Sequence, residues 1–384
     1  MNVSDTGMSN ITKVVDRYVE VFDADQDSYV LHPWTWLDPQ GGTPHYVFIL
    51  PVVALVALVT NITIGIVIVK EKLVSSANII MIGIAVSDTL TVLSPTPLLV
   101  TIYWQNFAKE VPFDLCVVWE YFMKNICAVT HTASVWLTMY LGINRYLGIC
   151  HPFVMRRRCT IKSTVQTIFF IYTVSVLFHL CRFVDTKYVP EFVSNSSTNT
   201  CSARYADWVG DVNNQRTYEC IYYWCHIICI SIIPCSVLII LDTIMLRQIR
   251  KSEIKRSIFQ TENQKEASKR KQSDSIRTTK IIVTILAIVC VLELSLGTIL
   301  ALWTLNMMGY LTISEDILGR TSTFIHFAIY ISYPFIFLLY CRLSSQFKKG
   351  ISGLLSCESS SRRKRTATQS LSLKTQSSLI IDPP

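Results

Sequence analysis

Polar side chains inside long apolar stretches are the first candidates for chemistry, because a charge at membrane depth is costly and usually serves a function. Asp88 stands in the middle of "IGIAVSDTLTV", and Asn61 stands centrally in the apolar stretch before it. Their oxygens could share a water or a sodium ion, since hard cations prefer oxygen ligands. A polar contact between two helices without any ion is an equally good interpretation.

A second group of polar residues falls at one end of the apolar stretches. Glu120 and Lys124 are four residues apart and share a helical face. Lys124 precedes Arg145 by 21 residues, which is about 30 Å of helix. Glu293 and His326 lie in the corresponding halves of two later stretches. With seven aromatic neighbours they would line a cavity polar enough for a peptide: Trp119, Tyr222, Tyr223, Trp224, His226, Trp303 and Tyr330. The alternative for each aromatic residue is a place in the core.

The elements that position these residues must cross a membrane. The 384 residues are 51% hydrophobic and 16% charged, with a mean hydropathy of +0.38, more apolar than a soluble domain. A helix needs about 20 apolar residues to cross the hydrocarbon core. Runs of this kind occur at 47–69, 77–102, 116–147, 164–183, 218–245, 280–304 and 322–340. We therefore predict an all-α membrane protein, a bundle of seven transmembrane helices over 46–341.

Lysines and arginines next to the runs predict the orientation, because basic residues near span ends stay in the cytoplasm. They concentrate after the first, third, fifth and seventh runs. We therefore predict an extracellular N-terminus, with residues 1–45 as a disordered polar arm. The net charge of +8 then reflects this topology rather than nucleic-acid binding.

Several residues outside the runs are candidates for covalent modification. Sequons predict glycosylation of Asn2, Asn10 and Asn195 on the outer side. Cys116 and Cys201 fall on the same oxidising side, and we predict that they form a disulfide. Cys220 is the rival partner. The other cysteines mostly stand singly in apolar runs, where they act as small hydrophobic residues, so no metal site or cofactor is expected.

The C-terminal region divides into two predicted segments. Apolar residues at helical spacing opposite Lys348 and Lys349 predict a short amphipathic eighth helix, 342–356, lying in the membrane interface. Cys357 follows at a position suited to palmitoylation, with an unmodified thiol as the alternative. Residues 357–384 are predicted to be a disordered cytoplasmic tail, in which basic residues before Thr366 favour phosphorylation by a kinase.

The triplet Asn144-Arg145-Tyr146 ends the third run. It resembles the Asp/Glu-Arg-Tyr motif of rhodopsin-like (class A) G-protein-coupled receptors, in which the arginine engages the G protein when the sixth helix swings out. Other landmarks agree in order along the chain: Asn61, Asp88, Cys116 with Cys201, Pro234 and "SYPFIFLLYC". The resemblance implies that the triplet, together with Arg156, Arg157 and Arg158, contacts a heterotrimeric G protein.

Three motifs depart from that family pattern. Asn144 replaces the acidic residue, "VLELSLG" replaces Cys-Trp-x-Pro, and "YPFIF" replaces Asn-Pro-x-x-Tyr. These departures, with "HTASVWLTMYLGINRYLGICHP" and "CRFVDTKYVP", are similar to the invertebrate myoinhibitory peptide receptors, the sex-peptide receptor group. That resemblance implies a plasma-membrane receptor without enzyme activity that binds a secreted amidated peptide with spaced tryptophans and couples mainly to Gi/o. Arrestin and receptor kinases are the expected partners of the phosphorylated tail, and membrane lipid surrounds the bundle.

Other functions remain as alternatives. The chain could bind another invertebrate neuropeptide, such as an FMRFamide-like peptide, or be a receptor-like scaffold that no longer signals. A transporter or channel is disfavoured, because the sequence shows no internal repeat. The last run contains no Lys for a retinal Schiff base, and the third run contains no Asp to bind a small amine.

The altered motifs suggest two mechanistic hypotheses. The missing Trp and Pro of the sixth run suggest that Glu293 acts as a polar switch, because a buried carboxylate must find a partner or stay protonated. The missing acid at position 144 suggests that Arg145 is less restrained at rest, which would give basal signalling.

Overall fold

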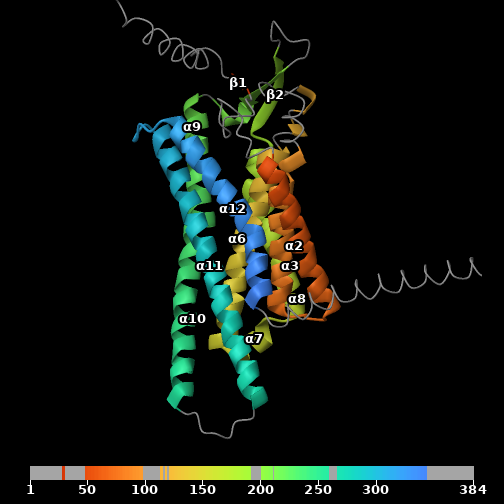
Figure 1. Ribbon diagram of the computed structural model, residues 1–384. Helices are drawn as coiled ribbons and strands as arrows, with labels where there is room; N and C mark the ends of the chain where they lie inside the picture. The colour runs from red at the N-terminus through yellow and green to blue at the C-terminus, as the bar shows by residue number, and fades with distance from the viewer. Residues whose placement is uncertain are drawn as a thin grey trace, which may run out of the picture.

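The computed structural model describes residues 28–30, 48–97, 113–115, 117–118, 121–191, 200–210, 212–258 and 266–343. Long helices run side by side, with a small sheet at one end of the bundle and the short helix α7, Pro152–Arg158, at the other (Figure 1). These ends are called the sheet end and the α7 end below.

Among the described residues, six helical segments are long and apolar enough to cross a membrane. They contain or overlap the first six predicted runs, and the seventh run lies within α12, whose helix contains Pro334. The principal helices are α2 (Leu50–Lys70), α3 (Ser76–Leu93), α6 (Ile126–Cys150), α8 (Ile161–His179), α9 (Val212–His226), α10 (Ile233–Ile258), α11 (Glu266–Met307) and α12 (Glu315–Leu343). A π-helical turn, Tyr121–Asn125, precedes α6, a 3-10 turn, Leu180–Phe183, follows α8, and a second π segment, Ile227–Ile232, joins α9 to α10.

Helix α2 shows why the bundle needs an apolar solvent. Its outward face exposes large apolar side chains, among them Val52 and Leu55, while the polar side chains of Thr60 and Asn61 are buried. This arrangement is the reverse of a soluble helix and suits a hydrocarbon environment. The helical form pairs the backbone polar groups of the interior of the segment with one another, as lipid requires.

The helices pack in a closed arrangement, in which α2 contacts α3 and α12, α3 and α6 contact each other and α8, and α10 contacts α6 and α11. The apolar cluster nearer α7 contains Leu137, Leu238, Met245, Ile282 and Leu286. Gly142 permits the close approach of α6 to α10, since a Cβ there would lie 2.6 Å from Leu238 Cδ2. A second apolar cluster, nearer the sheet, contains Leu50, Val92, Leu296 and Ile329.

The sheet has three antiparallel strands in the order β1-β3-β2: β1 is Ser28–Val30, β2 is Thr186–Glu191 and β3 is Thr200–Tyr205. Strand β1 comes from the arm that was predicted to be disordered, so that prediction is wrong for these three residues. Their backbone pairs with the open edge of β3, with Tyr29 opposite Ala203, and the ladder satisfies polar groups that local sequence alone would leave to water.

Candidate functional site

A buried acid and a half-buried histidine face each other between α6 and α11. His131 Nε2 lies 3.4 Å from Glu293 Oε1, and Glu293 is only 4% exposed. His131 Nε2 and Glu293 Oε1 are close but do not form a hydrogen bond. Glu293 Oε2 also has no hydrogen-bond partner within the described residues. With the imidazole protonated the contact is an ion pair, and the low dielectric of the bundle makes its strength sensitive to small helix movements.

His179 joins three helices at the sheet end. One ring nitrogen lies 2.8 Å from the Thr132 hydroxyl of α6, and the other lies 2.8 Å from the Tyr222 hydroxyl of α9. The His226 ring packs against His179 with a centroid separation of 5.9 Å, and its Nδ1 is buried without a partner among the described residues. Because a neutral imidazole donates from one nitrogen and accepts at the other, His179 couples the hydroxyls on either side.

Arg182 anchors the end of α8 to α9. Its guanidinium donates to Asp185 at 3.0 Å and lies 3.8 Å from Glu219. The same group lies 4.8 Å from the centre of the Tyr222 ring, and Tyr218 donates a second hydrogen bond to Asp185 at 3.0 Å. The buried cation is thus compensated by two carboxylates and an aromatic face.

Helix α12 adds two polar groups to the same half of the bundle. His326 Nδ1 donates to the Ser322 carbonyl at 2.8 Å, which places the proton on Nδ1 and leaves Nε2 as an acceptor in the neutral ring. The Tyr330 hydroxyl lies 3.6 Å from the Cys127 sulfur of α6.

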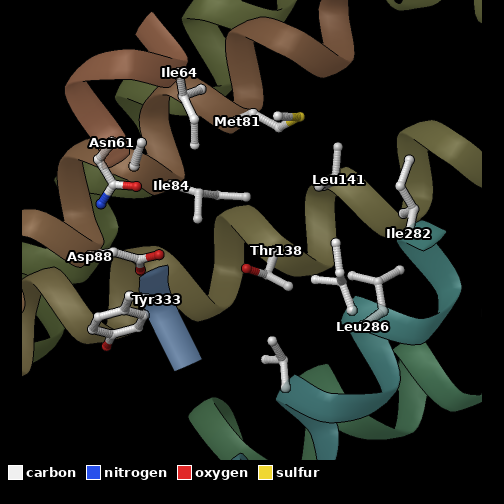
Figure 2. A pocket seen from close by; sticks show the side chains of 13 residues that line it. Asn61, Ile64, Met81, Ile84, Asp88, Thr138, Leu141, Ile282, Leu286 and Tyr333 are labelled. Atoms are coloured by element: carbon white, nitrogen blue, oxygen red, sulfur yellow. The ribbon is translucent and has the colours of Figure 1, made fainter. Parts of the chain in front are cut away.

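Asn61 and Asp88 line a cavity of about 50 Å³. In Figure 2 they lie with Tyr333 at one side of it, while Leu141 and Leu286 lie at the other. The polar side chains of Asn61 and Asp88 do not bond to each other but form two separate hydrogen bonds. Asp88 accepts from Ser134 at 2.5 Å, and Asn61 donates to Thr89 at 2.9 Å. The cavity has room for about three water molecules.

The predicted arginine motif ends α6 at the α7 end. Asn144 is fully buried and donates to Ser76 of α3 at 2.8 Å. Ser76 in turn lies 2.6 Å from the Thr164 hydroxyl of α8. Arg145 is half-buried, and the Tyr146 hydroxyl lies 3.3 Å from His151 Nε2. Asn144 therefore ties three helices together, a role open to a neutral amide. The side chains of Arg156, Arg157 and Arg158 are exposed on α7.

Residues 60–337 match the family of 7 transmembrane receptors (rhodopsin family). The chain belongs to the rhodopsin family. This receptor is 26% identical over 310 residues to the sex peptide receptor of Drosophila melanogaster, covering 80% of this chain and 71% of that protein. It is 26% identical over 314 residues to the sex peptide receptor-related protein 2 of Caenorhabditis elegans, covering 78% and 69%. It is also 26% identical over 216 residues to the FMRFamide receptor of Drosophila melanogaster, covering 53% and 37%.

These matches confirm the predicted seven-helix architecture, the resemblance to the sex-peptide receptor group and the absence of an enzymatic role. The receptor is a multi-pass membrane protein and a G-protein-coupled receptor.

Some predicted residues of the receptor lie outside the described ranges: Trp119, Glu120, Cys116, Asn2, Asn10, Asn195, Cys357 and Thr366. Of the predicted eighth helix only residues 342–343 are described, and they end α12. Cys201 lies in β3, and the rival cysteine, Cys220, is a buried free thiol of α9.

The remaining candidates for the ligand cavity divide into two groups. Tyr222, His226, Glu293, His326 and Tyr330 lie in the polar half described above. Lys124, Tyr223, Trp224 and Trp303 are half-buried, and the Tyr223 ring packs edge-on against Tyr222.

Sequence reasoning missed four polar residues in the interior of this receptor: the half-buried His131 and the buried His179, Arg182 and Asp242. The first three join helices in the polar half. All four lie inside or at the end of apolar runs, so the rule that singled out Asp88 would also have found them.

Proposed function

We propose that this receptor is activated by a secreted, amidated neuropeptide of the myoinhibitory type and signals mainly through Gi/o. Similarity to proteins named sex peptide receptor and FMRFamide receptor supports a peptide ligand. The observation that carries the proposal is the buried acceptor oxygen of Glu293, which has no hydrogen-bond partner among the described residues. It lies in the half of the bundle toward the sheet.

The open oxygen of Glu293 fits an amidated peptide better than a free acid. A C-terminal carboxamide offers N–H donors to a carboxylate, whereas a C-terminal carboxylate would bring a second negative charge into a desolvated site. The buried His226 Nδ1 provides another polar group for a peptide. Tyr222, His326 and Tyr330 complete the proposed contacts, with Trp119, Glu120, Lys124, Tyr223, Trp224 and Trp303 around them.

The orientation that we propose places the sheet end outside the plasma membrane and the α7 end in the cytoplasm. The exposed arginines of α7 support it, because basic residues near span ends stay inside. Arg145, Tyr146 and α7 then form the surface for the G protein. Phosphorylation near Thr366 would recruit arrestin, and palmitoylation of Cys357 would hold the eighth helix at the membrane.

Glu293 is the proposed switch between these two ends. A ligand shifts a two-state bundle only by preferring one state. A peptide donor on Glu293 Oε2 competes with His131 for the carboxylate, so binding changes the one charged contact described here between α6 and α11. The pair thus takes the place of the aromatic residue and the kinking proline that "VLELSLG" lacks.

The proposed function is tested in cells that express the full chain, by recording cAMP and calcium during exposure to amidated peptides. The panel contains spaced-tryptophan and Arg-Phe-amide peptides, each with its free-acid form. We expect a saturable fall in cAMP with amidated tryptophan peptides, lost in Arg145→Ala at equal surface expression. A response only to Arg-Phe-amide peptides would favour the FMRFamide-like alternative, while silence at normal surface expression would favour a scaffold that does not signal.

A further inference from the structure

Asp242 is a buried acid in an otherwise apolar stripe of α10. From Cys235 onward the buried positions of this stripe recur every three or four residues: Cys235, Leu238, Asp242, Met245 and Ile249. Asp242 is 8% exposed, and its Oδ1 has no hydrogen-bond partner within the described residues. A carboxylate kept at membrane depth without compensation is costly. We therefore expect the Asp242 carboxylate to bind a partner in another arrangement of the helices.

The packing of α6 against α10 indicates which side chain that partner is. Both helices run from the sheet end toward the α7 end (Figure 1), and they meet where Gly142 faces Leu238. Asp242 follows Leu238 by four residues, and Arg145 follows Gly142 by three, so each lies about one helical turn, 5.4 Å, beyond the same contact. Tyr146, next to Arg145, packs on the apolar cluster that contains Leu238 and Met245.

The surroundings of Asp242 are otherwise apolar on the neighbouring helix. Ile282, Val283 and Leu286 of α11 belong to the same cluster as Leu238 and Met245. A shift of α11 away from this cluster would give the long Arg145 side chain room to reach α10. A guanidinium binds a carboxylate through two parallel hydrogen bonds, the strongest side-chain geometry available to it.

We propose that Asp242 is the carboxylate partner of Arg145 in the G-protein-coupling state, and so supplies from α10 the acid that Asn144 does not provide on α6. The inference rests on the proposed G-protein coupling and adds a positioning residue to it. Asp242 holds the arginine extended across the α6–α10 interface, and formation of the pair favours the coupling state. The neutral Asn144 suits this role, because it bonds to Ser76 and does not compete for the guanidinium.

The functional test measures nucleotide exchange on purified Gi, with the full receptor in lipid nanodiscs, both without ligand and with an amidated spaced-tryptophan peptide. We expect Asp242→Asn to lower exchange by about tenfold, within the range of site-to-site coupling, and to weaken peptide binding by no more than the same factor, because the peptide and the pair favour the same state. Asp242→Glu should restore most of the exchange. Unchanged or increased exchange in Asp242→Asn would overturn the proposed role.

A second test detects the proximity of the two side chains without any ligand or G protein. In the double variant Arg145→His with Asp242→His, Zn²⁺ should raise the melting temperature of the purified receptor, because a metal bound only by the folded state stabilises it. The matched control, Arg145→His with Thr243→His, places the second histidine on the exposed face of α10 and should show no such rise. Equal responses of the two double variants, or none in either, would overturn the pairing. If the wild type promotes no exchange on Gi while the zinc effect is present, the proposed function fails and the proximity of the pair stands.

Discussion

In the half of the bundle toward the sheet, buried charged groups are compensated by one another, whereas the half toward α7 is filled by an apolar cluster with few polar side chains. Arg182 lies among two carboxylates and an aromatic ring, and His131 faces Glu293. Leu238, Met245 and Leu286 instead fill the other half. Under the proposed function, the charged half binds the ligand and the apolar half transmits the response through close-packed helices.

Removal of the Arg182 cation is expected to lower the stability of the receptor more than the other changes below. Arg182→Leu should destabilise the receptor by about 3–5 kcal/mol, because it leaves the buried Asp185 and the half-buried Glu219 without the cation that compensates them. The check is the melting temperature of the purified receptor together with its surface expression. The control is Arg204→Ala, since Arg204 is exposed on β3 and should change neither quantity. Equal effects of the two variants would contradict the buried ion cluster.

In the apolar half, the addition of one methyl group should lower stability through packing alone. Gly142→Ala should cost roughly 1–3 kcal/mol of stability, because the added Cβ would lie 2.6 Å from Leu238 Cδ2. In the control, Gly65→Ala, nothing lies within 4 Å of the new Cβ, and the higher helix propensity of Ala should stabilise by up to about 1 kcal/mol. Melting curves of both variants test the expectation, and a stabilised Gly142→Ala receptor would refute the close approach of α6 and α10.

The smallest expected effect concerns the restraint of Arg145. Asn144→Asp restores an acid beside the half-buried Arg145, and an ion pair of about 0.5–1 kcal/mol, net of the cost of burying the new carboxylate, should lower basal signalling by roughly two- to fivefold. Basal cAMP at matched surface expression measures it. Asn144→Ala also removes the hydrogen bond to Ser76 but adds no charge, so the same fall in that variant would argue against the electrostatic explanation.

The sequence predicted the number and place of the apolar runs well, because span length is fixed by the membrane and needs no knowledge of tertiary contacts. Strand β1 was missed, because its pairing partner, β3, lies more than 170 residues further along the chain.

Individual contacts within the site were harder to predict than the site itself. Glu293 was singled out as a buried acid, but its partner on α6, His131, was not, since helix rotation decides which side chains meet. Asn61 and Asp88 were placed in one region correctly, yet each bonds to a different hydroxyl. Serines and threonines near a carboxylate or an amide compete for it, and single-sequence spacing does not rank them.

The central claim is that the Glu293 carboxylate both binds the peptide amide and switches the contact between α6 and α11. It is tested most directly by dose–response curves for an amidated spaced-tryptophan peptide and its free acid, on the wild type and on Glu293→Gln at equal surface expression. The account predicts that the variant loses about tenfold in potency for the amidated peptide and discriminates less against the free acid, because the repelling charge is gone. Unchanged potency and unchanged discrimination in Glu293→Gln would contradict it.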